Sequence, residues 1–301
     1  MQDSKIKIAA VFILLSFIWG STWLAIRLGL ESLTPLFSAG VRFAIASFII
    51  FIIIKIRKIK PATDKTALRL YFVMGFFSFV IPFGLVYWAE QYVPSGLASV
   101  LFAVYPFCVV IFSWLFLKSE IINFFKVAGI LLGFAGIVVI FSDSLDDIFS
   151  AYFWGMAAVV FSGMMQAAIA VTIKKYGGYL NAFTINFIPM SIAALSLILL
   201  GLIFEDVDSI RINAGGILSV LYLAVFGSII TFTSYYWLLK RVSVIILSML
   251  AFITPVVALI LGWLIFDEYL TERHLTGVVL VLSGLVTANI LNFIKIFRKQ
   301  T

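Results

Sequence analysis

Ten long apolar runs follow one another along this chain of 301 residues, and charged residues are confined almost wholly to their ends. A helix that crosses about 30 Å of hydrocarbon needs about 20 predominantly apolar residues. The runs cover approximately 8–30, 36–54, 68–89, 94–117, 125–142, 152–174, 184–204, 217–239, 243–266 and 273–294. Because they are continuous and do not alternate, helices are favoured over the strands of a membrane barrel. The sequence therefore predicts an all-α integral membrane protein with ten transmembrane helices.

Composition agrees with a chain whose solvent is largely lipid. Hydrophobic residues make up 63% and charged residues 12%, whereas soluble domains are nearer a half and a quarter. Lys5 and Lys7 precede the first run as in a signal peptide, but that run is longer than a signal core and nine more follow, which indicates a retained span. With a single cysteine, Cys108, and a single histidine, His274, neither a disulfide framework nor a metal cluster is expected. No cofactor is expected either.

Basic residues predict the orientation of the spans. If the N-terminus is cytoplasmic, every Lys and Arg falls on the cytoplasmic side except Arg27, Arg211, Arg273 and the intramembrane Arg42. Such a bias is the usual signature of cytoplasmic segments. We therefore expect a multi-pass protein of the bacterial inner membrane with both termini in the cytoplasm. The net charge of +7 is accounted for by topology, and no nucleic-acid partner is expected.

An internal repeat divides the chain. With residues 87–115 laid over 236–264, the matches include Tyr87-Trp88 with Tyr236-Trp237, Pro106 with Pro255, and Trp114-Leu115 with Trp263-Leu264. After a one-residue deletion the match continues with Glu120 on Glu268, Gly129 on Gly277 and Gly136 on Gly284. The predicted halves are 1–147 and 148–301, each with five spans. Because five is odd, the second half is inverted relative to the first, as in many secondary transporters.

Several of these motifs resemble the EamA-domain transporters, the ten-span branch of the drug/metabolite transporter superfamily. The motifs are Trp19-Gly20-Ser21, Arg42-Phe43, the stretch YWAEQYVPSGLA at 87–98, Pro106, and Trp-Leu-Phe-Leu before Glu120. The resemblance covers essentially the whole chain, although the second repeat has Lys240-Arg241-Val242-Ser243 where the first has the Pro-Ser-Gly-Leu-Ala form. It implies transport of small metabolites, often amino acids or related amphipathic compounds, and leaves the substrate open.

Two polar features lie deep in the first two spans. Trp19 is at mid-depth, where its ring N–H needs a partner; with Ser21 it either lines a substrate cavity or packs helices together through Gly20. Arg42 is the only charge well inside a span and is expected to face protein or water. It binds a substrate carboxylate or caps backbone carbonyls, and its place in a motif shared across substrates favours the structural role.

Other candidates come from the repeat. Pro106 and Pro255 free carbonyls at the centres of matched spans, so we predict gating helices there, with Tyr105 and Thr254 beside them as substrate contacts. Tyr87 and Tyr236 are gate residues or belong to the interfacial aromatic belts. The predicted substrate-binding residues are Trp19, Ser21, Arg42, Tyr87, Tyr105, Gln166 and Thr254, and the predicted gating residues are Pro106, Pro255 and Tyr236.

The positions of the glycines and of the carboxylates carry two further predictions. Gly129 and Gly133 form a GxxxG pattern that indicates a helix contact, within a monomer or across a homodimer. No carboxylate lies at mid-membrane; Glu90, at the edge of the third span, either couples transport to protons or ions, or the substrate moves down its own gradient. The second alternative, with export, is favoured.

Function follows from this architecture. We expect a secondary transporter that exports a small amphipathic metabolite by alternating access, with membrane lipid as its surroundings. The alternative is a flippase for lipids or lipid-linked sugars. The chain has no Gly-rich phosphate-binding motif that ends in Gly-Lys-Ser/Thr, and His274 stands without a catalytic partner set, so an enzyme is not expected.

Overall fold

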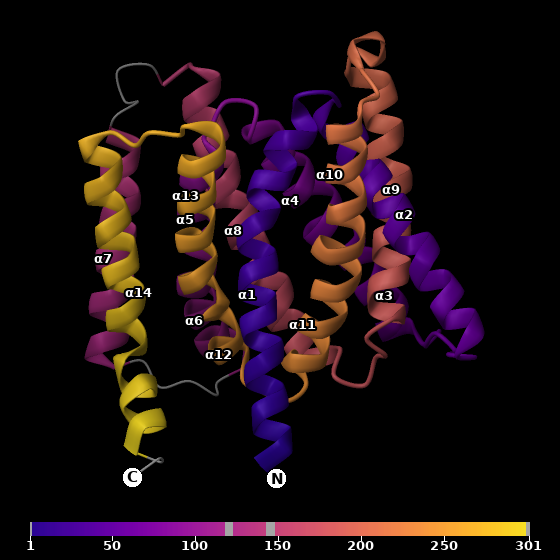
Figure 1. The fold of residues 1–301 in the computed structure, drawn as a ribbon. Helices are drawn as coiled ribbons and strands as arrows, with labels where there is room; N and C mark the ends of the chain where they lie inside the picture. The colour runs from indigo at the N-terminus through magenta and orange to yellow at the C-terminus, as the bar shows by residue number, and fades with distance from the viewer. Residues whose placement is uncertain (1, 118–122, 143–147, 299–301) are drawn as a thin grey trace.

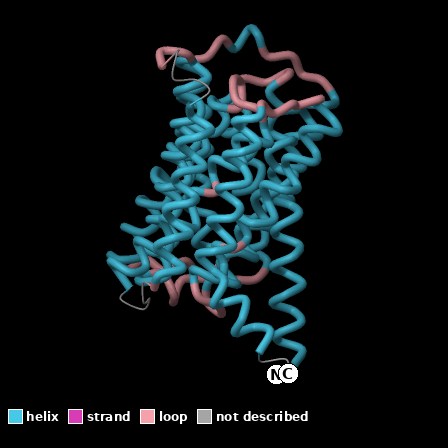
Figure 2. The backbone as a smooth tube through the Cα atoms, turned by 90° about the vertical axis from the view of Figure 1, so that its left-hand side faces the viewer, coloured by secondary structure: helices cyan, strands magenta, loops and turns pink. Residues whose placement is uncertain are grey.

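The computed structural model describes residues 2–117, 123–142 and 148–298. Within these ranges the chain is helical with connecting turns and has no strand. The long helices run along a common direction, and both termini lie at the same end of the bundle (Figures 1 and 2). We call this end the termini end and the opposite end the far end. The fold class predicted from the sequence is confirmed.

The elements repeat in the same order in the two halves of the chain. The first half contains α1 (Gln2–Leu30), α2 (Pro35–Ile56), α3 (Lys65–Met74), η1 (Gly75–Val80), α4 (Ile81–Ala89), α5 (Ser95–Phe102), α6 (Val104–Leu117) and α7 (Phe124–Phe141). The second half contains α8 (Ala151–Tyr176), α9 (Thr184–Phe204), η3 (Val207–Ser209), α10 (Ala214–Ala224), η4 (Val225–Ile230), α11 (Thr231–Leu239), α12 (Val244–Ser248), α13 (Leu250–Phe266) and α14 (Glu272–Arg298).

The number of spans differs slightly from the prediction of ten. Nine helical segments in the described chain are long and apolar enough to cross a membrane, from Ile6–Leu30 to Val244–Phe266. The tenth predicted span, 273–294, falls in α14, a continuous helix of 27 residues. It is not among the nine, and the side chains at its C-terminal part lie outside the described residues. The prediction is thus confirmed for the fold class, while ten is not an exact count.

Matched interruptions occur in both halves. The third span of each half changes from α-helix to π-helix, in η1 and η4, before it returns to α-helix. The fourth span of each half is also broken, at Ala103 between α5 and α6 and at Met249 between α12 and α13. The helix that starts the third span is capped by Asp64 in the first half and by Asn213 in the second. Glu120 and the acidic residues before the predicted boundary at 147/148 (Asp143, Asp146 and Asp147) lie outside the described ranges.

Helices at equivalent positions of the two halves pack against each other. The pairs are α2 with α9 and α7 with α14, and Figure 1 shows α7 and α14 side by side at one edge of the bundle. Gly129 lies against the backbone of Gly284 and Ala288, and Gly133 lies against the ring of Phe107. The glycine pattern is therefore used for packing within the chain.

Gly129→Ala is expected to destabilise this helix pair. An added Cβ would lie 2.4 Å from the Ala288 nitrogen and 2.5 Å from the Gly284 oxygen, so the helices would have to separate, at a cost of about 1–3 kcal/mol. Thermal unfolding in detergent should show a lower melting temperature. Gly178→Ala is the matched control, since nothing lies within 4 Å of its added Cβ; equal melting of the two variants would contradict the prediction.

Candidate substrate site

A central cavity of about 130 Å³ lies among helices of both halves. Its walls come from α1, α2, η1 and α4, the α5–α6 break, α8, α11 and α13. The lining is mostly aromatic and aliphatic, with a few polar side chains.

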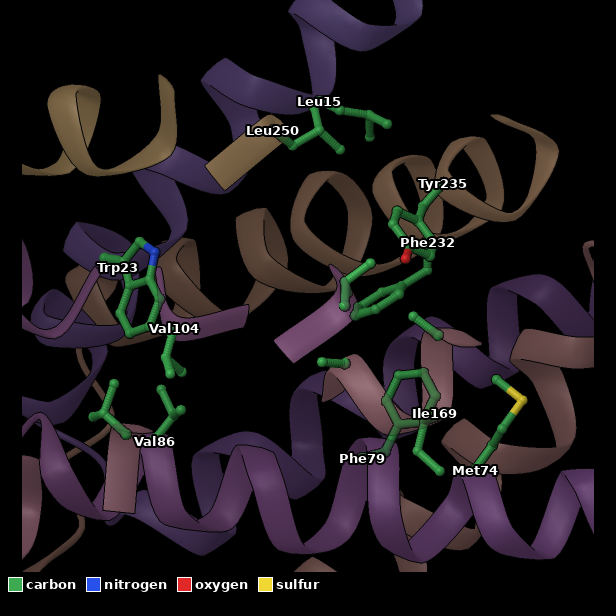
Figure 3. Close-up of a cluster of buried hydrophobic side chains, with 14 of the residues drawn as sticks. Leu15, Trp23, Met74, Phe79, Val86, Val104, Ile169, Phe232, Tyr235 and Leu250 are labelled. Atoms are coloured by element: carbon green, nitrogen blue, oxygen red, sulfur yellow. The ribbon is translucent and has the colours of Figure 1, made fainter. Parts of the chain in front are cut away.

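The aromatic wall is built from α1 and α11. The ring of Trp19 lies 5.8 Å from that of Phe232 and 5.4 Å from that of Tyr235, and Trp23 packs edge-on against Phe102 at 5.6 Å. Figure 3 shows Trp23 and Phe232 within a cluster of buried hydrophobic side chains. Ring pairs at these distances prefer defined relative orientations, so the wall presents rigid apolar faces to a ligand.

Arg42 supplies a positive charge to this apolar cavity. Its side chain is 2% exposed, and its Nε donates to the Ser228 hydroxyl at 2.9 Å. One Nη donates to the Tyr87 hydroxyl at 3.2 Å and the other to the Gly227 carbonyl at 2.8 Å. Among the described residues its hydrogen-bond partners include no carboxylate. A guanidinium has five N–H donors, so these three bonds leave two donors unused.

Two further polar contacts hold the cavity wall. The Gln166 amide oxygen accepts from the Ser78 hydroxyl at 2.9 Å, and its nitrogen donates to the Ser78 carbonyl at 2.9 Å. The Tyr105 and Tyr235 hydroxyls lie 2.7 Å apart in a hydrogen bond. The Ser78–Gln166 and Tyr105–Tyr235 contacts each join the two halves of the chain.

The structure brings together most, though not all, of the residues predicted to form the site. Those that line the cavity are Trp19, Arg42, Tyr105, Gln166, Tyr236 and Thr254. Ser21 is not among them: its hydroxyl lies 2.6 Å from that of Tyr222 on α10, because residues two apart on a helix do not share a face. Tyr87 is fully buried beside Arg42, and Pro106 and Pro255 are buried within their helices.

Other lining residues were missed by the sequence analysis. Thr22 and Trp23 line the cavity three and four residues after Trp19, which helical periodicity could have shown. Phe232 stands in the same relation to Tyr235 and Tyr236. Ser78 had no sequence signal, because its role depends on the π-helix η1.

A second cavity lies at the termini end. Its lining includes Lys174, Gly177, Leu180, Leu239 and Lys240, and Tyr236 lines both cavities. The Lys174 ammonium donates to the Val242 carbonyl at 2.7 Å, and that of Lys240 donates to the Leu180 carbonyl. Burial lowers the pKa of Lys240, with a smaller contribution from Arg241. We call this second cavity the basic vestibule. Tyr236 therefore stands between the central cavity and the basic vestibule.

At the far end, polar contacts link neighbouring helices. The Arg27 guanidinium donates to the Glu90 backbone carbonyl and so joins α1 to the end of α4. The Glu268 carboxylate accepts from the Ser95 and Gly96 backbone N–H groups at 2.8 and 3.0 Å. A carboxylate at a helix N-terminus is stabilised by the free N–H groups and the helix dipole.

A cavity between two similar sets of long apolar helices is typical of a polytopic transporter, and comparison with known proteins agrees. The model of the EamA-like transporter family matches residues 6–142 and again residues 151–290. The chain belongs to this family and is a multi-pass membrane transporter.

Individual relatives extend over nearly the whole chain. Protein PagO of Salmonella typhimurium is 30% identical over 93% of this chain and 92% of its own length. The uncharacterized inner membrane transporter YedA of Escherichia coli is 32% identical over 91% and 88%. The uncharacterized transporter YoaV of Bacillus subtilis is 27% identical over 93% and 96%. One solved crystal structure, 18% identical, has a TM-score of 0.71 and covers 95% of this chain and 98% of its own, which shows the shared fold.

Arg42→Lys is expected to weaken the joint between the halves. A lysine ammonium cannot reproduce the fork that reaches Ser228, Tyr87 and Gly227, and each buried partner left unsatisfied costs about 1–3 kcal/mol. The melting temperature in detergent should fall. Ser47→Ala on the same helix is the control, because its hydroxyl bonds only the Ala44 carbonyl; a loss as large in this variant would argue against the prediction.

Proposed function

We propose that this transporter exports a small amphipathic metabolite, with an apolar or aromatic body and an anionic group, of the amino-acid class. The single observation that carries this proposal is a guanidinium with unused donors at the wall of a mostly apolar cavity. Trp19, Trp23 and Tyr105 would contact the body of the substrate, and Arg42 would bind its carboxylate. Gln166 and Thr254 offer further hydrogen bonds.

Alternating access would use the two cavities. In the state described here the far end is cross-linked, whereas Tyr236 separates the central cavity from the vestibule at the termini end. Rotation of the Tyr236 ring would join the two cavities and admit a substrate. The basic vestibule, with Lys174 and Lys240, suits an anionic substrate that arrives from that side.

The termini end would face the cytoplasm. Its exposed basic residues include Lys58, Lys60 and Arg241, whereas Glu205, Asp206 and Asp208 follow the far end of α9. Basic residues beside span ends are retained in the cytoplasm. The movement from vestibule to far end is then export.

Substrate screening tests the proposal directly. Purified protein should gain thermal stability with a panel of aromatic and aliphatic amino acids, because a ligand that binds only the folded form stabilises it. A stabilising compound should then show counterflow in proteoliposomes. A panel in which only compounds without a carboxylate bind would overturn the assignment of Arg42.

Trp19→Ala and Tyr105→Ala should each abolish counterflow of that compound while protein remains in the membrane. Each change removes a wall of the cavity that a substrate must contact. Trp154→Ala and Tyr176→Ala are matched controls, since these side chains are 54% and 51% exposed. Normal transport by both cavity variants would contradict the proposal that the cavity is the substrate site.

The proposed orientation predicts which introduced cysteines react in spheroplasts. In a Cys108→Ala background, an impermeant maleimide should label Asp208→Cys and leave Lys60→Cys unlabelled until the cells are lysed. Both native side chains are exposed at opposite ends of the bundle. The reverse labelling pattern would show that the far end faces the cytoplasm, and the proposed direction of transport would then be import.

A further inference from the structure

Glu90 is a buried carboxylate without a partner. It directly follows the span Lys65–Ala89, its side chain is 0% exposed, and neither carboxylate oxygen has a hydrogen-bond partner in the described chain. The other buried unpartnered atoms there belong to hydroxyls and to the amide of Asn186. Burial without a partner strongly disfavours an ionised carboxylate, and protonation removes its charge.

Charged groups surround Glu90 but bond elsewhere. From α1, Arg27 donates to the Glu90 backbone carbonyl; from α2, Arg42 bonds Tyr87, Ser228 and Gly227. After α13, Glu268 is held by the N-terminus of α5. Burial raises the pKa of Glu90 well above its usual range, Glu268 raises it further, and Arg27 and Arg42 act in the opposite direction. Tyr87 is the titratable neighbour on α4 itself.

Glu90 lies at the far end, where opening of the bundle would expose its side chain to water. The Arg27 contact joins α1 to the end of α4, and just inside it Ile26 of α1 and Val86 of α4 both line the central cavity. A path from the cavity to the far end that runs between these two residues would separate α1 from α4. That separation would break the Arg27 contact and bring water to Glu90.

We propose that Glu90 is the proton-binding site of the far-end gate, protonated while α1 and α4 are joined and ionised once they separate. On opening, the carboxylic O–H bond breaks, the proton passes to water, and the carboxylate that remains is solvated beside Arg27. The closed state binds the proton more tightly, so acid favours closure and alkali favours opening. The inference rests on the proposed alternating access and adds the ion that is linked to it.

Infrared spectroscopy of protein in nanodiscs tests the protonation. The wild type should show the C=O stretch of a protonated carboxylic acid, lost on titration to alkaline pH and absent from Glu90→Gln. Glu205→Gln should leave that band unchanged, because the Glu205 oxygens each accept an N–H, from Leu36 and from Phe37. A wild-type spectrum without the band, or a band that persists in Glu90→Gln, would overturn the proposal.

Spin labels test the link to the gate. Glu31 and Tyr92 follow α1 and α4 and are exposed, so Glu31→Cys with Tyr92→Cys in a Cys108→Ala background reports their separation by pulsed electron resonance. Alkaline pH should add a longer distance when Glu90 is present and only the short one in Glu90→Gln; Glu90→Asp should retain the pH response. Distances that ignore pH, or that respond equally in Glu90→Gln, would refute the link. Neither experiment uses a substrate, so their failure would leave the proposed substrate class untouched.

Discussion

A polar side chain inside a membrane protein needs a bonded partner, and this requirement joins the two halves of the transporter at its cavity. Arg42 from the first half bonds Ser228 and Gly227 of η4, and Gln166 from the second half bonds Ser78 of η1. Each π-helix thus serves a side chain from the opposite half. A π-helix shifts the i→i−4 pattern and leaves backbone groups free for such contacts, which is why matched spans carry it at the same place.

These joints also shape the cavity. Arg42, Ser78 and Gln166 are at once structural partners and lining residues, so the polar atoms that a ligand can reach are held in place by tertiary bonds. The aromatic rings fill the space between them and offer no competing acceptors beyond the tyrosine hydroxyls. The proposed substrate, with one charged group and an apolar body, would therefore have one favoured orientation in the cavity.

The sequence predicted the helical elements well because their signals are local. Apolar runs defined the spans to within a few residues. Trp19 was found from its unusual depth. The π-helices were not predicted, since tertiary contacts rather than local propensity stabilise them. The prolines alone did not fix where the fourth spans break. The break at Met249 lies six residues before Pro255, whereas the break at Ala103 lies three residues before Pro106. The functional roles of the site residues stay predictions.

The symmetry mates Tyr87 and Tyr236 show how an inverted repeat can occupy one of two states. Tyr87 is fully buried and accepts a hydrogen bond from Arg42, whereas Tyr236 lines both the central cavity and the vestibule. The two tyrosines thus have different surroundings, and part of the difference lies in the sequence, because α9 has no arginine to match Arg42 of α2. If the halves exchange shapes, Tyr87 takes the place between two cavities at the far end, and the bond to Arg42 must break. The charge on Arg42 would then need another partner, and the proposed anionic substrate would supply one.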